Sequence, residues 1–337
     1  MAARGTAGQE DTVKRRTPLR LLALAAVAVL AAVPPLAGGF TLHLGVEAAT
    51  LATAALALGL LVGRGGMVSL GHAAFWGLGA YAAALLARHV APWPWLALPV
   101  AALVAVGFAL ATGVLVLRGR GIFFLMLTLA FAQLAHVLAL QWRDLTGGDD
   151  GIAGVPALTG LEDHRALYGL AIGTLVGSYL LLSAAWASPL GQVLDAARQN
   201  EARARALGYP VFLYRLAAYA LAAAVTGVAG AIAAHERGFV HPRDLSWSVS
   251  GVMLIVVLLG GPQAPWGPAV GASAYVAVEA WASARSDYWN LFLGLLLVAT
   301  VLWGRGGLAG LAAWASSGVR RLARGGADGG AAGGAPV

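Results

Sequence analysis

Ten long apolar stretches occupy most of this 337-residue chain and leave little polar sequence between them. Only 11% of the residues are charged and 59% are hydrophobic, whereas soluble domains carry about 25% charged residues. A helix needs about 20 apolar residues to cross a hydrocarbon core of about 30 Å. The sequence therefore excludes a water-soluble fold and predicts an all-α polytopic membrane protein with about ten transmembrane helices, in a range of eight to ten.

The predicted spans define a transmembrane domain over residues 19–304. They are 19–38, 42–63, 67–87, 95–117, 121–141, 166–186, 213–234, 246–261, 266–283 and 288–304. The eighth span is short and glycine-rich, so it is either re-entrant or packed between other helices. A basic segment, 1–18, precedes this domain, and the Gly/Ala-rich tail 305–337 has a composition for which we expect disorder.

The basic residues predict an orientation. With the N-terminus in the cytoplasm, the cytoplasmic segments contain 16 of the 22 lysines and arginines, and the outer loops contain 6. Cytoplasmic loops of membrane proteins are enriched in these residues. We therefore expect both termini inside the cell, and this sorting accounts for the net charge of +7 without a nucleic-acid partner.

Two absences exclude several kinds of chemistry. The chain has no cysteine, which excludes disulfides, cysteine-ligated metals and thiol catalysis. Lys14 is the only lysine, whereas a P-loop needs a lysine in G-x-x-x-x-G-K-[ST] to reach the nucleotide phosphates. The chain therefore cannot hydrolyse ATP through a P-loop. The seven histidines are scattered along the sequence, so we expect no metal site and no cofactor in this chain.

The longest predicted cytoplasmic loop, 187–212, contains a helix-forming stretch. Pro189 marks the start of a short predicted helix and Gly208 marks its end. Two charge pairs with helical spacing support it: Asp195 with Arg198, and Glu201 with Arg205. The spacing leaves two interpretations open, a solvated helix between spans or a slim, alanine-rich helix held in a groove of another protein.

At this loop the sequence resembles the coupling-helix region of ABC importer permeases. Glu201-Ala202, Ala206 and Gly208 match an E-A-x-x-x-A-x-G pattern that, in those permeases, inserts into a cleft on the ATPase subunit. Three further blocks, 63–87, 120–156 and 238–272, extend the match over about 60–310. Together they resemble the Liv permease family of branched-chain amino acid ABC importers, and specifically its M-type membrane subunit.

The resemblance implies an ABC importer permease bundle in the bacterial plasma (inner) membrane, which supplies half of a heterodimeric pathway. It implies four further subunits: an H-type permease, two ABC ATPases that bind ATP-Mg, and an extracytoplasmic substrate-binding protein. It also implies a set of residues in the ATPase-coupling helix at 191–208: Asp195, Arg198, Asn200, Glu201, Ala202, Arg203, Arg205 and Gly208.

Small or uncharged polar residues inside the predicted spans are candidates for the translocation pathway, which must replace water around a zwitterionic substrate. They are Ser69, Gly71, His72, Thr128 and Gln133. The alternative is structural, since such side chains also bond across membrane helices and glycines let backbones approach closely. At the outer face, the acidic turn TGGDDG predicts contact with the binding protein through Thr146, Gly147, Asp149 and Asp150, with a solvated turn as the alternative.

Two other functional classes remain as alternatives. An ion-gradient-driven secondary transporter of small polar solutes would need an acidic or histidine pair deep in the bundle. Glu47 and Glu279 lie inside spans but near the outer ends, so a proton relay at the membrane midplane is not expected. An integral-membrane enzyme would need clustered His, Asp or Glu at one membrane face. Within the ABC class, urea or short amides are alternative substrates.

Overall fold

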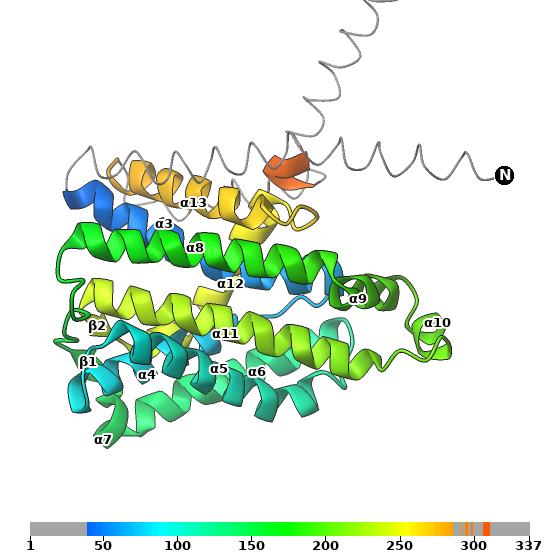
Figure 1. Cartoon of the computed structure of the whole chain (residues 1–337), viewed down its shortest axis with the longest axis horizontal. Helices are drawn as coiled ribbons and strands as arrows, with labels where there is room; N and C mark the ends of the chain where they lie inside the picture. The colour runs from blue at the N-terminus through cyan, green and yellow to red at the C-terminus, as the bar shows by residue number, and fades with distance from the viewer. Residues whose placement is uncertain (1–38, 286–290, 292–293, 296–297, 299–305, 311–337) are drawn as a thin grey trace, which may run out of the picture.

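The structure, a computed structural model, describes residues 39–285, 291, 294–295, 298 and 306–310. The predicted segments 1–18 and 19–38 therefore lie outside the described residues, as do most of 288–304 and most of the tail. Helices dominate the described part (Figure 1). The long ones are α3 (Gly39–Leu60), α4 (His72–His89), α5 (Pro94–Val116), α6 (Ile122–Gln141), α8 (His164–Ala187), α11 (Val211–Arg237), α12 (Trp247–Gly260) and α13 (Gly267–Ser283).

Short elements connect the long helices at the two ends. They are the π-helical turn η1 (Leu61–Gly65), α7 (Arg143–Thr146), η2 (Gly148–Asp150), β1 (Ile152–Ala153), α9 (Pro189–Gln199), α10 (Glu201–Ala206), β2 (Phe239–Val240) and η3 (Pro242–Leu245). The two strands pair antiparallel, with Ile152 opposite Val240. This pairing ties the loop before α8 to the loop after α11.

Within the part of the chain that the structure describes, five helical segments are long and apolar enough to cross a membrane. They are Gly39–Gly65, Pro94–Val116, Ile122–Gln141, His164–Ala187 and Val211–Arg237, and α12 is a shorter apolar helix. Helices α4 and α13 also coincide with predicted spans. The prediction of a helical membrane protein is therefore confirmed, whereas the count of ten spans stays a prediction.

The connections fall at two opposite ends of the bundle. Figure 1 shows α9 and α10 at one end and β1, β2 and α7 at the other. The loops predicted to be cytoplasmic meet at the α9–α10 end, where α9 packs against η1, α8 and α11. We call the two ends the α9–α10 end and the strand end.

Glycines allow the backbones of α4 and α11 to touch at the centre of the bundle. A β-carbon built on Gly79 would lie 2.6 Å from the Cα of Gly227, and one built on Gly227 would lie 2.8 Å from the carbonyl oxygen of Ala101 in α5. Any side chain at these positions would push the helices apart. The expected role of glycine in helix packing is confirmed here.

The third predicted span starts later than expected. Residues 67–71 are not helical, and α4 begins at His72 rather than at 67. Gly66, with φ of 62°, ends η1 in a left-handed conformation and turns the chain back toward the bundle. Hydropathy did not reveal this break because the stretch is as apolar as its neighbours.

Candidate functional site

The loop between α8 and α11 holds two helices, which corrects the single helix expected up to Gly208. Asn200 has extended backbone angles and separates α9 from α10, and its side-chain oxygen accepts a hydrogen bond from the Arg203 N–H at 3.0 Å. An asparagine at this position caps the second helix. Gly208 follows α10 with φ of 86°, as expected for a helix C-terminus. We call α9 and α10 together the coupling unit.

Glu201, the first residue of α10, is the centre of an ion-pair network. Its carboxylate forms three ion pairs. The partners are Arg205 of α10 at 2.7 Å, Arg120 of the α5–α6 loop at 3.0 Å and Arg215 of α11 at 3.0 Å. The glutamate side chain is only 10% exposed and the Arg215 side chain only 14%. Glu201 therefore fastens α10 to two other segments of the same chain.

Asp195 fastens α9 to the end of α3 in a similar way. Its carboxylate accepts hydrogen bonds from Arg198 at 2.9 Å and from the Gln199 amide at 3.0 Å, and it lies 3.7 Å from Arg64 in η1. The Arg64 guanidinium lies over the Trp186 ring of α8, 4.8 Å from its centroid. Both expected charge pairs, Asp195–Arg198 and Glu201–Arg205, are thus confirmed.

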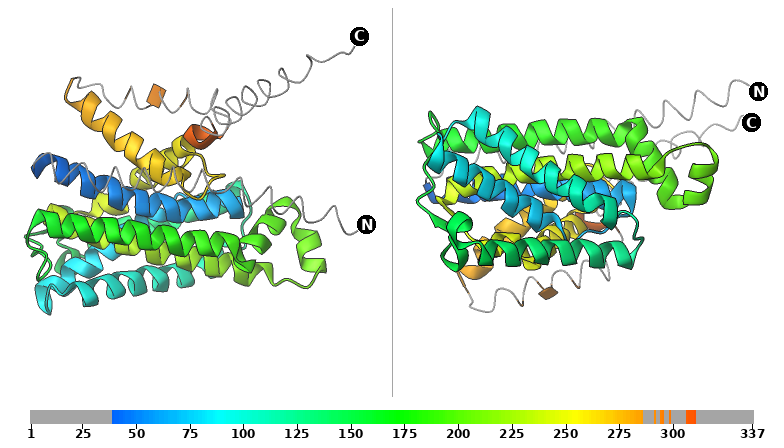
Figure 2. Two further views of the ribbon diagram at one scale, coloured as in Figure 1. Left: turned by 45° about the horizontal axis from the view of Figure 1, so that its top comes forward. Right: turned by 90° about the horizontal axis from the view of Figure 1, so that it is seen from below.

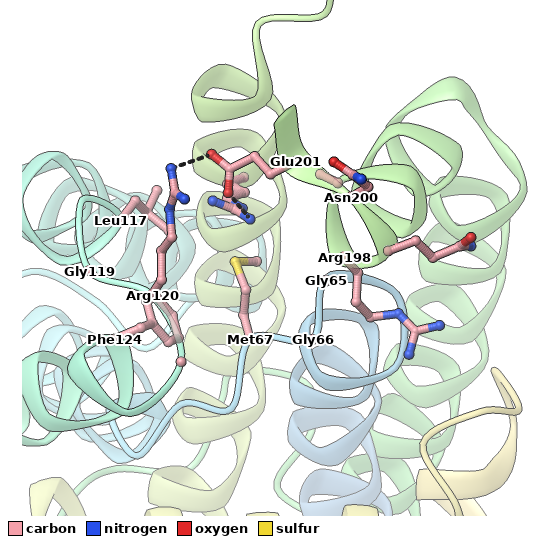
Figure 3. Close-up of a pocket in the computed structure, with 14 residues that line it drawn as sticks. Gly65, Gly66, Met67, Leu117, Gly119, Arg120, Phe124, Arg198, Asn200 and Glu201 are labelled. Carbon is pink, nitrogen blue, oxygen red and sulfur yellow. Dashed lines mark hydrogen bonds and ion pairs between the residues drawn. The ribbon is translucent and has the colours of Figure 1, made fainter. Parts of the chain in front are cut away.

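A pocket of about 290 Å³ lies between the coupling unit and the helix ends (Figure 3). Its walls come from residues 65–67, the α5–α6 loop, the α9–α10 junction and α11, and include Arg120, Arg198, Glu201 and Arg215. Gly66 allows the Arg198 side chain to pack against its backbone, because a β-carbon at Gly66 would lie only 2.8 Å from the arginine Cγ. A movement of the coupling unit would therefore reach α3, α6 and α11 together.

The outer face of the coupling unit is small and exposed. Ala202, Arg203 and Ala206 are exposed, and Leu207 is 71% exposed beyond them. The inward face is sealed by the buried cluster Ala197, Ala204 and Val211. The alanines therefore pack closely on the inward side and leave a narrow exposed surface on the outward side.

Four of the predicted pathway residues, Ser69, Gly71, His72 and Thr128, come together at the break before α4. The Thr128 hydroxyl accepts from the Leu70 N–H at 3.1 Å, and the Ser69 hydroxyl accepts from the Gly71 N–H at 3.1 Å. The buried His72 ring lies 3.2 Å from the same serine oxygen through Nδ1. These contacts satisfy backbone groups that have no helical partner, which is the structural interpretation that the sequence left open.

Ser250 of α12 completes this arrangement and was missed by sequence reasoning. Its hydroxyl accepts from the Ala73 N–H at 2.8 Å, in the first turn of α4. Thr128 lies six residues, or about 9 Å along the helix axis, from the start of α6. Gln133, a further candidate, lies one and a half turns beyond Thr128, and its Oε1 has no hydrogen bond within the described residues. The pathway role of this set stays a prediction.

The acidic turn expected to contact a binding protein lies at the strand end. Thr146 is buried and its hydroxyl donates to carbonyl groups of α6 and of Trp142. Gly147 has φ of 78° and reverses the chain, so that Asp149 and Asp150 are exposed. Glycine and threonine therefore shape the turn, and only the two aspartates offer side chains to a partner.

The structure also gathers charged residues that looked scattered in the sequence. Glu47 of α3 and Glu279 of α13 line one cavity near the strand end, together with His43, Glu236 and Asp244. The sequence placed both glutamates near the outer ends of their spans, and the structure adds that they share one cavity. The helical spacing of His43 with Glu47, and of Tyr275 with Glu279, is the sequence signal that would have indicated a common polar face.

Comparisons with known proteins agree with these features. A family described as "Branched-chain amino acid transport system / permease component" matches residues 40–301. The chain is 31% identical over 294 residues to the high-affinity branched-chain amino acid transport system permease protein LivM of Escherichia coli K12, covering 78% of this chain and 69% of the relative. It is 31% identical over 330 residues to LivM of Salmonella typhimurium, covering 88% and 76%.

No solved structure matches the chain significantly. The family match covers most of the sequence, including Asp195 and Glu201 of the coupling unit and the break before α4. It also spans all the long helices from α4 to α13. The chain therefore belongs to the Liv family of branched-chain amino acid transport permeases.

Proposed function

We propose that this chain is the M-type membrane subunit of an ATP-driven importer of branched-chain amino acids. It supplies half of the translocation pathway, and an H-type permease supplies the other half. Two ATPase subunits bind ATP-Mg on the cytoplasmic side, and an extracytoplasmic binding protein delivers the substrate. Family membership and similarity to two LivM proteins support the transport role and the substrate class.

The coupling unit carries the mechanical part of this proposal. Glu201 joins it to the α5–α6 loop and α11, and Asp195 joins it to η1. A push on the exposed face of α10 therefore acts on three spanning segments together. In this scheme the ATPases close on ATP, bring the coupling units of the two permeases together and switch the pathway between its inward-facing and outward-facing states.

Charge supports the proposed orientation. In the described residues the α9–α10 end carries seven arginines and two carboxylates, Asp195 and Glu201, whereas acidic residues are in excess at the strand end. Positive charge favours the cytoplasmic side. The coupling unit would then face the ATPases, and the acidic turn at 146–150 would face the binding protein.

Co-purification tests this assignment. The tagged chain is extracted from its native membrane in mild detergent, and the proteins that accompany it are identified by mass spectrometry. The proposal expects two P-loop ATPases and a second permease in the wild-type sample. Recovery of the chain alone, while a known ABC complex stays intact under the same conditions, would favour the ion-gradient-driven alternative.

A further inference from the structure

A cavity of about 350 Å³ lies near the strand end, between α3, α4, α11, α12 and α13. The left view of Figure 2 shows α13 leaning away from the other helices toward this end. The cavity is lined by polar residues of α3, α11, η3 and α13, and by apolar residues of α3, α4 and α12. It is separate from the coupling pocket and shares no lining residue with it.

Four charged residues on the lining of this cavity form two ion pairs. His43 pairs with Glu236, and Arg237 pairs with Asp244 at 3.0 Å. Glu47 and Glu279 line the same space and form no ion pair with any described residue. The lining thus has an excess of negative charge, and a charge at membrane depth is costly unless a partner compensates it.

Tyr275 adds a polar group to the lining of the cavity. The side chain lines the cavity, is only 5% exposed, and makes no hydrogen bond through its hydroxyl within the described residues. Tyr275 shares this lining with Glu279, one helical turn further along α13, and with Glu47 of α3. A tyrosine hydroxyl can both donate and accept a hydrogen bond, so Tyr275 on this lining is available to a ligand.

Part of the lining of the cavity is apolar. It is formed by Leu51, Trp76, Val249, Val252 and Met253. A pocket with an apolar wall and a few convergent polar groups is the usual form of a small-molecule site. The acidic residues do not form a metal site, because no group of three His, Asp or Glu in the described part of the chain is arranged to hold one.

We propose that this cavity binds the amino acid on its way through the permease. The substrate ammonium group lies between Glu47, Glu279 and the Tyr275 hydroxyl, and the branched aliphatic side chain lies on the wall formed by α12 and Trp76. Arg237 is the cation on the same lining that faces the substrate carboxylate. This inference rests on the proposed import of amino acids and assigns the recognition of the ammonium group to this chain.

Thiol labelling tests binding directly, because the chain has no native cysteine. Val252, half-buried on the apolar wall, is replaced by cysteine in the assembled importer in membrane vesicles. Its reaction with a small thiol reagent is timed with and without saturating L-leucine. The proposal expects leucine to slow labelling about tenfold or more, and expects the double variant Glu47→Gln/Glu279→Gln to remove that protection.

Uptake provides the second measurement. Glu47→Gln, Glu279→Gln and Tyr275→Phe should each lower leucine uptake, and the double glutamine variant about tenfold or more, while ATP hydrolysis and assembly with the partners persist. Glu162→Gln, an exposed glutamate near the same end and outside the cavity, is the matched control and should import like the wild type.

The outcomes separate the two proposals. If the wild type imports leucine but leucine does not slow the labelling of Val252→Cys, the cavity assignment is wrong and the proposed importer function stands. Unchanged leucine uptake in the Glu47→Gln/Glu279→Gln variant would have the same meaning. Protection by urea or choline as strong as by leucine would also overturn the cavity assignment, because the site would then not recognise an amino acid. A wild-type chain that neither imports leucine nor binds ATPases would contradict the proposed function itself, while the labelling result would still decide the cavity.

Discussion

Glu201 and Arg215 form an ion pair of 3.0 Å that links the first residue of α10 to the second turn of α11. Both side chains are largely buried, and α11 runs the whole length of the bundle beside α4 and α5. The pair connects the exposed coupling unit directly to the longest membrane-spanning helix. Force applied to α10 therefore has a short route into the transmembrane core.

Arg215 should matter more than the other two arginines around Glu201. Arg215→Gln removes a partner that is 14% exposed, whereas Arg205 and Arg120 are 57% and 63% exposed and exchange readily with water. We expect ATP-dependent uptake to fall severalfold for Arg215→Gln and less than twofold for Arg205→Gln. Equal losses in the two variants would contradict a special link between α10 and α11.

The cap between α9 and α10 should depend on the Asn200 side chain. Asn200→Ala removes the acceptor for the Arg203 N–H and should cost about 1 kcal/mol of local stability. Asn200→Asp keeps the acceptor and serves as the matched control. Hydrogen exchange at residues 201–206 measures the effect, and equal exchange in the alanine and aspartate variants would refute the cap.

The break before α4 should depend on two hydroxyl groups from distant segments. Thr128→Val leaves the part-buried Leu70 N–H without its acceptor, and Ser250→Ala does the same to the buried Ala73 N–H. Each should lower the stability of the purified protein by about 1–3 kcal/mol, visible as a lower unfolding temperature in detergent. Thr159→Val, in the loop between β1 and α8, is the control because this threonine forms no side-chain hydrogen bond among the described contacts.

Helix packing should fail when Gly79 gains a side chain. Gly79→Val places atoms against the backbone of Gly227, so the folded yield and unfolding temperature should both drop. Gly169→Val in α8 introduces the same residue at a helical glycine with no heavy atom within 4 Å and should be tolerated. A Gly79 variant as stable as the Gly169 variant would show that the α4–α11 contact is loose.

Single cysteines can test the orientation. Ala202→Cys on the exposed face of α10 and Asp150→Cys in the strand-end turn should react with impermeant reagents from opposite sides of the membrane. In intact cells we expect the second to react and the first to be protected. Reaction of both from outside would contradict the orientation of the coupling unit.

The sequence predicted the helical elements well, because long apolar runs and their basic flanks are local features. The charge pairs Asp195–Arg198 and Glu201–Arg205 were also predictable, since helical spacing brings their side chains together. The break at 67–71 was not, because its compensation comes from Thr128 and Ser250, far away in the sequence. A local pattern cannot show a hydrogen bond that a different helix supplies.

The same reason explains why the sequence did not show the contacts that charged residues make with distant segments. Glu201 meets Arg120 and Arg215 only when the α5–α6 loop and α11 pack together. Glu47 and Glu279, more than 200 residues apart in the sequence, share a cavity only because α3 packs against α13. The sequence identified these residues as unusual but not what they face.

Uptake by the purified importer in proteoliposomes tests the central claim most directly. Vesicles containing this chain, its partner permease and the ATPases are loaded with ATP, and the binding protein is added outside with radiolabelled leucine. We predict accumulation of leucine that requires internal ATP and disappears in vesicles without it. Accumulation driven by an ion gradient without ATP, or ATP-dependent uptake of urea but not of leucine, would contradict the account.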